Sequence, residues 1–548
     1  SSIYYAIEKN SSLKIIKYLI SKGADLRSSS LEGLISPIFQ ALKNKNYEVL
    51  EFLVNDELDI YDLDANENTP LDIAIYNKDY KAISLLLDKI QFENNKSFKS
   101  LFTLLMVNDS VSTNLFKEKL KKFIETNKSL LSKTDLFMYA SFIGDKTIIT
   151  ELLNDGFNIN IIDNYKMNAL MWASFSNNIE IVKLLLDKSI DINVQNENGL
   201  TALMFSCLNN NKDIVKYLLE KDANYKLLNN YKSSTYEICT FKDSLESLLI
   251  LLDYNDNIDK KYLLNTASYN GSFNITKYLI KNGVEYSKME EEDTSPLLLA
   301  SQQGNFDIVK LLIENGVNIN EVDKDGNTSL HYSVENNNKE IFKYLINYGA
   351  NLNLKNQIGN TPLMLAIYNY QLDLAKDLIN SGADLNIKNE DGWNALMIAS
   401  SDYTFLPIGE EILGKYSNLE EKTYDGESAL MIASTNESTR ILNKLIFMGA
   451  EIDTVDNDGA TPLMWASYHN VLSSLEILLD SKANLEYEDY NGNTALIYAT
   501  KNNSLEAIDY LIKMGANTKV RNYEGKGLLD LAGSIETRKY LIAKGVKW

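Results

Sequence analysis

The sequence predicts an all-α solenoid, in which one continuous stack of short helix pairs runs over residues 1–548. Similar segments recur about every 33 residues, and inside each segment apolar residues recur at helical spacing. The composition agrees, because hydrophobic residues make up 45% of the chain and charged residues 24%, as in folded proteins. With 6 prolines and 25 glycines, the chain has no long flexible linkers between separate domains.

The repeat is defined by segments such as Thr361-Pro-Leu-Met-Leu-Ala366, which end in a small residue that we call the anchor. Nearly every step between anchors is 33 residues. The step from Ala74 to Ala140 is twice as long and predicts a degenerate unit near Val107, so the register gives 17 units. The anchors are Ala6, Ala41, Ala74, Ala140, Ala173, Ser206, Cys239, Ala267, Ala300, Ser333, Ala366, Ala399, Ala433, Ala466, Ala499 and Ala532.

Each unit is expected to fold as two antiparallel helices and a turn. Threonine at the start can accept a backbone N–H as the N-cap, and the proline that follows loses only an N–H without a helical partner. Leucine three positions before the anchor shares its face, so neighbouring helices can approach closely. Second helices, such as residues 308–313, end at a glycine suited to a left-handed C-cap, and a turn such as Asp323-Lys-Asp-Gly326 follows. These glycines include Gly316, Gly349, Gly382, Gly449 and Gly515.

This combination of turn glycine, Thr-Pro-Leu, anchor alanine and Ile-Val at one period resembles the ankyrin repeat over essentially the whole chain. The strongest unit is residues 323–350, where Thr328-Ser-Leu-His331 keeps the family's histidine. The resemblance implies a curved superhelix with turn fingers along one edge, first helices on the concave side, and binding of proteins. Most other units carry methionine at the histidine position, namely Met171, Met204, Met364, Met397, Met431 and Met464.

We expect one array over residues 1–548, divided by the regularity of its units. Its predicted sections are repeats 1–3 at 1–96, a degenerate repeat 4 at 97–127, repeats 5–8 at 128–253, repeats 9–13 (first part) at 254–400, an irregular loop and helix of repeat 13 at 401–427, and repeats 14–17 with a C-terminal cap at 428–548.

Three irregularities interrupt the register. Residues 98–127 lose the turn glycine and the Thr-Pro-Leu start, a finger is shortened around residues 253–258, and residues 401–407 replace the usual turn between helices. They are either drift that a long array tolerates or points where the superhelix bends and separate binding segments meet.

The net charge of −21 argues against nucleic-acid partners, because binding to phosphates depends on lysine and arginine. It favours protein partners with basic segments. The stretch from Lys513 to Trp548 departs from the average with eight basic and three acidic residues, and we interpret it as a solvated terminal face. We expect a monomer.

Catalysis finds no support in the sequence. There are two histidines, His331 and His469, and neither lies in a nucleophile or phosphate-binding motif. Cys207 and Cys239 fall at apolar helix positions and are expected to be buried thiols. We therefore predict no enzyme activity, no metal, no cofactor and no membrane span. The first residues show no signal peptide, which leaves a cytoplasmic and an exported, trimmed chain equally open.

Aromatic residues recur at the positions one before, two after and three after the anchor, on the side of the first helix opposite the core-facing leucine. We predict that they line a concave groove that binds a partner, because exposed aromatics dominate protein interfaces. The alternative is that these side chains pack between adjacent repeats, both those directly before the anchor and Phe142, Phe175, Phe241, Tyr368 and Tyr468. The candidates are Tyr139, Phe142, Trp172, Phe175, Phe205, Phe241, Tyr269, Tyr332, Tyr368, Trp465, Tyr468 and Tyr498.

The predicted fingers offer a second binding surface. Most of their tip residues are small, polar and typical of turns, but Trp393 stands out because a finger has little core in which to bury an indole. The function predicted from these surfaces is that of a protein-binding scaffold or adaptor. Two alternatives remain: an inhibitor or host-directed effector that sequesters one enzyme, and a passive structural spacer.

Overall fold

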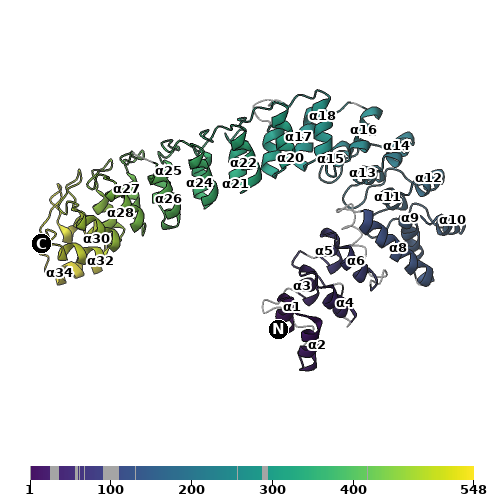
Figure 1. Ribbon diagram of the computed structural model, residues 1–548, viewed down its shortest axis with the longest axis horizontal. Helices are drawn as coiled ribbons and strands as arrows, with labels where there is room; N and C mark the ends of the chain where they lie inside the picture. The colour runs from purple at the N-terminus through teal and green to yellow at the C-terminus, as the bar shows by residue number, and fades with distance from the viewer. Residues whose placement is uncertain are drawn as a thin grey trace. The chain divides into compact units, whose positions relative to one another are not determined.

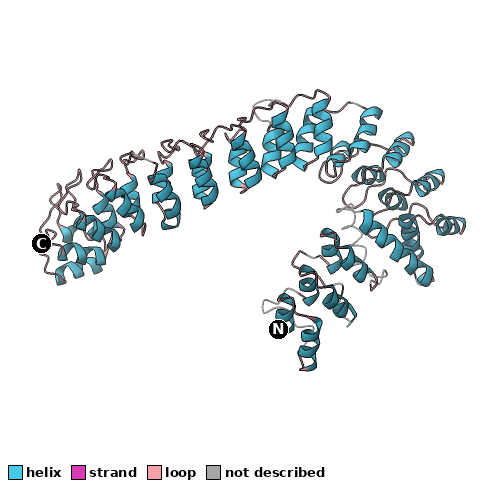
Figure 2. Ribbon diagram, in the orientation of Figure 1, coloured by secondary structure: helices cyan, strands magenta, loops and turns pink. Residues whose placement is uncertain are grey.

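The chain folds into pairs of short helices, as a computed structural model shows (Figure 1). The structure describes residues 2–24, 36–55, 60, 62–66, 68–89, 110–129, 131–255, 257–286, 294–415 and 418–547. Within these ranges there are isolated β-bridges but no β-strand (Figure 2), so the all-α fold class is confirmed. Two compact units divide the chain, unit 1 at Ser1–Leu263 and unit 2 at Leu264–Trp548, and the division falls within α17 (Lys260–Asn270).

Unit 1 alternates first and second helices along the chain. Its described helices are α1 (Ser2–Glu8), α2 (Leu13–Ser21), α3 (Pro37–Lys43), α4 (Tyr47–Asn55), α5 (Pro70–Tyr76), α6 (Tyr80–Leu87), α8 (Ser110–Asn127), α9 (Lys133–Ile143), α10 (Lys146–Asn154), α11 (Ala169–Phe175), α12 (Ile179–Asp187), α13 (Ala202–Leu208), α14 (Lys212–Glu220), α15 (Thr235–Thr240) and α16 (Leu245–Tyr254).

Unit 2 continues the same alternation, with its finger loops along one edge of the helix row (Figure 2). After α17 come α18 (Phe273–Lys281), α19 (Pro296–Gln303), α20 (Phe306–Glu314), α21 (Ser329–Glu335), α22 (Lys339–Asn347), α23 (Pro362–Tyr368), α24 (Leu372–Asn380), α25 (Ala395–Ser400), the 3₁₀ turn η1 (Tyr403–Phe405), α26 (Leu406–Leu413), α27 (Ala429–Ser434), α28 (Thr439–Phe447), α29 (Pro462–Tyr468), α30 (Leu472–Asp480), α31 (Ala495–Lys501), α32 (Leu505–Lys513), α33 (Leu528–Leu531) and α34 (Ile535–Ala543).

The first helices begin as the sequence predicts. The Thr361 hydroxyl accepts the backbone N–H of Met364, and Pro362 occupies the first helical position. In α21 the Thr328 hydroxyl accepts the backbone N–H of His331, and Nδ1 of the His331 ring accepts the backbone N–H of Thr328. Where methionine replaces histidine, sulfur can take the acceptor role: Met464 Sδ lies 3.4 Å from the Thr461 nitrogen.

Second helices end at glycines in the left-handed region, with φ of +89° at Gly316 and +91° at Gly382. This confirms the predicted C-caps, because glycine adopts positive φ without a steric cost. The core lies between the helices of each pair and between neighbouring pairs. In repeat after repeat the anchor and the Ile-Val pair are buried, as in Ala300, Ile308 and Val309. Each buried isoleucine or valine side chain contributes about 1.5–3 kcal/mol through burial.

Consecutive fingers are joined by two sets of hydrogen bonds. The backbone N–H at one finger tip donates to a carbonyl of the preceding tip, as from Asn457 to Asp425 (3.1 Å) and from Tyr490 to Asp458 (3.1 Å). Nearer the helices, a side chain accepts an N–H of the next repeat, as Asn353 Oδ1 does from Asp384 (2.9 Å). These bonds keep the fingers of adjacent repeats in register.

The irregular segments have distinct structures. α8 has 18 residues, twice the 9 of a regular second helix such as α12, whereas the proposed anchor Val107 lies outside the described residues. α16 ends at Tyr254 and α17 begins at Lys260, so the separation in sequence is too short for a full finger. In repeat 13, η1 leads directly into α26, with Pro407 in its first turn.

Candidate functional site

Aromatic side chains directly before the anchor are tied to the fingers. In four repeats the indole N–H or phenol O–H donates to an aspartate nine positions earlier, at the base of the finger. The aspartate's other oxygen accepts two backbone N–H groups of the turn, as Asp323 Oδ1 does from Asp325 and Asn327. The pairs are Trp172–Asp163 (2.8 Å), Tyr332–Asp323, Trp465–Asp456 (2.7 Å) and Tyr498–Asp489 (3.0 Å).

Where the residue before the anchor has no donor, the finger base is asparagine in five repeats. A carboxylate there would have a half-buried oxygen without a donor, whereas asparagine places its amide nitrogen at that point. In three of these repeats the amide donates to an asparagine of the preceding finger, as from Asn389 to Asn360 (3.2 Å). The pairs are Phe205–Asn196, Ile238–Asn229, Leu365–Asn356, Ile398–Asn389 and Leu531–Asn522.

The exposure predicted for the groove aromatics of unit 1 is wrong for five residues. First helices of consecutive repeats contact each other closely, so the rings before the anchor are enclosed between them. Those two positions after the anchor are covered by neighbouring rings and by α8. The buried residues are Tyr139, Phe142, Trp172, Phe175 and Phe205, none more than 3% exposed.

The covering side chains of α8 are Phe116 and Lys117. The Phe116 ring meets Phe142 edge-on at 6.2 Å, and Phe142 in turn packs against Trp172 and Phe175. Lys117 Nζ lies 5.5 Å from the centre of the Phe142 ring and donates to the Ser176 carbonyl (2.7 Å). The chain's own degenerate repeat thus fills this part of the predicted groove.

Burial lowers the pKa of Lys117 from 10.5 to about 8, which makes the stability of unit 1 pH-dependent. Between these values the unfolded chain keeps a proton that the folded chain has released, so stability should rise with pH through this window. Lys117→Met removes the effect. We expect K117M to exceed the wild type in unfolding midpoint at pH 7 and the difference to shrink by pH 10.5. A difference that stays constant from pH 7 to pH 11 would contradict the burial of this charge.

In unit 2 four rings on α29 and α31 form a cluster that is partly open to solvent, which we call the aromatic face: Trp465, Tyr468, His469 and Tyr498. The Trp465 and His469 rings stack at 5.9 Å, and Tyr468 and Tyr498 meet at 6.4 Å. Lys501 Nζ lies 5.8 Å from the centre of the Tyr498 ring, so a cation already rests against this cluster.

The other candidates are dispersed. Phe241, Tyr269 and Tyr368 are exposed by 48%, 46% and 41%, while Tyr332 is half-buried. Trp393 is also half-buried and packs against the core of unit 2, contrary to the expectation that a finger cannot cover an indole. It does so because its backbone N–H and C=O bond to Asn389, which folds the finger base back on the helices.

The fingers beside the aromatic face concentrate negative charge. Residues 384–489 carry 20 acidic and 6 basic side chains, and 14 of the acidic ones lie on the four fingers 384–391, 418–427, 451–458 and 484–489, with only two lysines. We call these four fingers the acidic fingers. Burial together with the like charges of Asp425 and Asp456 raises the pKa of Glu427, which reflects this crowding. The aromatic face is continuous with the acidic fingers through the Trp465–Asp456 and Tyr498–Asp489 hydrogen bonds.

Comparison with known proteins assigns the repeat. A family profile described as ankyrin repeats (3 copies) matches residues 3–97, 264–356 and 430–522, and two profiles of ankyrin repeats (many copies) match residues 170–219 and 345–399. The chain belongs to the ankyrin-repeat family.

A similar solved structure is the ankyrin repeat domain of Bcl-3, described as a unique member of the IkappaB protein family. It is 30% identical to this ankyrin-repeat chain, and the match covers 40% of this chain and 99% of that one, with a TM-score of 0.35. The search of curated proteins gave no match. The matching profiles describe repeats, and none of them is a catalytic domain.

Of the histidines and cysteines considered for catalysis, His331, Cys207 and Cys239 are buried within the fold. His331 is buried, with its second ring nitrogen 3.1 Å from the Asn360 carbonyl of the next repeat. Cys207 and Cys239 are buried free thiols, and burial raises the pKa of Cys207. Across the described ranges, no cluster of three potential metal ligands is found, and no helix has the length and apolar character needed to cross a bilayer.

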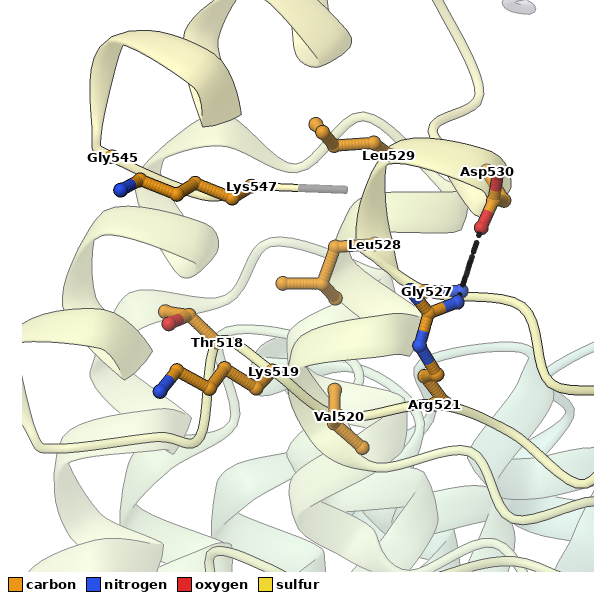
Figure 3. A pocket seen from close by; sticks show the side chains of 10 residues that line it. All are labelled: Thr518, Lys519, Val520, Arg521, Gly527, Leu528, Leu529, Asp530, Gly545 and Lys547. Atoms are coloured by element: carbon orange, nitrogen blue, oxygen red, sulfur yellow. Dashed lines mark hydrogen bonds and ion pairs between the residues drawn. The ribbon is translucent and has the colours of Figure 1, made fainter.

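A pocket of about 420 Å³ lies at the end of the last repeat (Figure 3). Lys519 and Lys547 extend to the same side, with Leu528 between them, while Arg521 points away toward Asp530 at 3.8 Å. Seven of the eight basic residues between 513 and 547 are exposed, as expected for a solvated face, and Arg538 is half-buried. Arg521 also donates to the Gly525 carbonyl (2.7 Å), so it stabilises its own turn.

The sequence places Asp323 in a turn, but the pairing of such finger-base aspartates with the aromatic residues and the combined charge of the acidic fingers were missed. Both signals were available: an aspartate nine positions before four of the donor aromatics, and the local excess of acidic residues between 384 and 489. The burial of Phe142 and Phe175 by α8 had no such signal, because the segment responsible does not follow the repeat register.

Proposed function

We propose that this ankyrin-repeat chain is a scaffold or adaptor that binds a partner protein through the aromatic face of unit 2 and the adjoining fingers. The observation that carries the proposal is a cluster of aromatic rings that the stack leaves partly open to solvent. Aromatic side chains give large, rigid contact areas and dominate the energetics of protein interfaces.

Neighbouring repeats support this choice of surface. Five of the six candidate rings of unit 1 are enclosed between helices or covered by neighbouring rings and α8, whereas the described residues place no such covering helix over Tyr468 and His469. We therefore assign the binding surface to the cluster of rings at α29 and α31. Phe241, Tyr269 and Tyr368 are also exposed, but among the described residues they belong to no such cluster.

The test is affinity capture with the full chain as bait, followed by titration of the captured protein. Tyr468→Ala removes a partly exposed ring whose hydroxyl makes no hydrogen bond among the described residues, and we expect partner affinity to fall roughly thirtyfold, as for a hot-spot residue. Phe447→Ala is the matched control, because Phe447 is 90% exposed on the second helix α28. Undiminished binding by Y468A with loss of binding by F447A would place the interface on the second helices and refute the proposal.

A further inference from the structure

The acidic fingers present carboxylates that the chain does not neutralise. Nine of the 14 are exposed, and among the described residues two form ion pairs: Glu421 with Lys388 (2.6 Å) and Glu390 with Lys355 (3.8 Å). The two finger lysines are also held by backbone carbonyls of the following repeat, Lys388 by Lys422 (2.7 Å) and Lys422 by Val455 (2.6 Å). Most of the negative charge thus has no basic partner among the described residues.

The finger tips are the most open part of this surface. Asp391, Asp425 and Asp458 occupy the same turn position in successive fingers, and within the described residues their carboxylates make no hydrogen bond or ion pair. Their backbones join consecutive fingers, because the carbonyls of Asp425 and Asp458 accept the backbone N–H of the next finger tip. Asparagine stands at this position in another finger, at Asn491, so a negative charge is not required for the turn.

Aromatic rings lie among these carboxylates. The Tyr424 and Tyr490 rings cover Gly392 and Gly459 of the preceding fingers, yet the two side chains remain 65% and 67% exposed. One face of each ring is therefore packed and the other is open beside negative charge. This is the environment that favours a lysine or arginine side chain, by cation–π and ionic attraction together.

The distance between adjacent fingers determines which side chains of a bound extended segment can reach them. Adjacent helix pairs stack at about 8–10 Å, and fingers joined by backbone hydrogen bonds follow the same step. An extended polyproline-type segment rises about 3.1 Å per residue with three residues per turn, so every third side chain points the same way at intervals of about 9 Å. One side chain of such a segment can reach each finger.

We propose that the acidic fingers bind an extended segment of a partner protein in which lysine or arginine recurs at every third position, one basic side chain to a finger. This inference rests on the proposed function, and it names the chemistry of the partner segment and the part of unit 2 that reads it. The aromatic face holds the neighbouring part of the partner, and Lys501 on Tyr498 shows how a cation sits against these rings.

The test measures binding of the full chain to two synthetic peptides of one composition. The first has four Lys-Pro-Ser triplets, and the second has its four lysines contiguous, so that they reach about two fingers. At low ionic strength we expect the triplet peptide to bind roughly fivefold more tightly, because each additional exposed ion pair adds a modest increment. Equal affinity of the two peptides would overturn the register.

Two charge-matched variants locate the site. The finger variant D391N/D425N/D458N should weaken binding of the triplet peptide roughly tenfold. The control E437Q/E476Q/D480N removes three exposed carboxylates from second helices or their flanks and should change affinity by less than twofold. Y424N/Y490N, which copies the residue at Asn457, should weaken binding about threefold to tenfold. If the finger and control variants weaken binding equally, peptide binding depends only on the net charge of the chain and the inference is wrong.

The two proposals fail separately. If neither peptide binds but Y468A still loses the captured partner, the basic-segment inference fails and the proposed function stands. If the triplet peptide binds as described while Y468A captures the partner unchanged, the fingers are a basic-peptide site and the aromatic face is not the interface.

Discussion

Tyr332→Phe is expected to destabilise its repeat by about 2 kcal/mol although it removes a single oxygen atom. The hydroxyl is the donor to Asp323 Oδ2, and Asp323 is only 6% exposed. Losing the donor leaves a buried carboxylate oxygen unpaired, which costs more than an ordinary hydrogen bond. Burial, together with the same contact, raises the pKa of Tyr332, so the hydroxyl stays a donor through the physiological range.

Asp323→Asn completes a double-mutant cycle with Tyr332→Phe. Leu365 and Asn356 already form the matched apolar pair at the same spacing, with the Asn356 amide donating to Asn327 Oδ1 (3.2 Å), so Y332F/D323N should recover at least half of the loss. Because a repeat array can open locally, the measurement is hydrogen exchange of backbone amides in residues 323–350. If the double variant is as unstable as the sum of its single variants, the pairing rule between the aromatic residue and the finger base is wrong.

Gly359→Ala should cost about 3 kcal/mol, the largest effect that we expect from a glycine in the fingers. Its φ of +75° strains any other residue, and a Cβ would lie 2.5 Å from the Glu390 nitrogen and 2.7 Å from the Asn389 Cα of the next finger. Both neighbours are backbone atoms held by the finger hydrogen bonds, including Glu390 to Ile358 (3.2 Å), so they cannot move aside without breaking that link.

Gly382 is the internal control. Its φ is +91°, but a Cβ there has open space around it, so Gly382→Ala should cost about 1 kcal/mol from the backbone alone. Comparing the thermal unfolding midpoints of Gly359→Ala and Gly382→Ala separates the effect of close approach between fingers from the effect of backbone strain. Equal shifts in midpoint would mean that the fingers do not press against one another as described.

The candidate site was only partly visible in the sequence. The positions around the anchor identified Trp465, Tyr468 and Tyr498, which lie on one partly open face. The same rule selected Trp172 and Phe175, which are core residues. A residue's position relative to the anchor predicts the same exposure in every repeat. The actual exposure of a ring depends on which neighbouring side chains and helices cover it.

The sequence alone determined the local features that repeat along the chain. The N-cap at Thr361, the helix end at Gly316 and the shared helix face of Leu363 and Ala366 each depend on residues within a few positions. A 33-residue period then fixes the stack, since every unit must bury the same apolar face on its neighbour. Only the tertiary structure decided which rings stay open. Lys117 and Phe116 reach Ser176 and Phe142 across 59 and 26 positions, and such contacts arise when an irregular helix meets a regular stack, a geometry that no local pattern encodes.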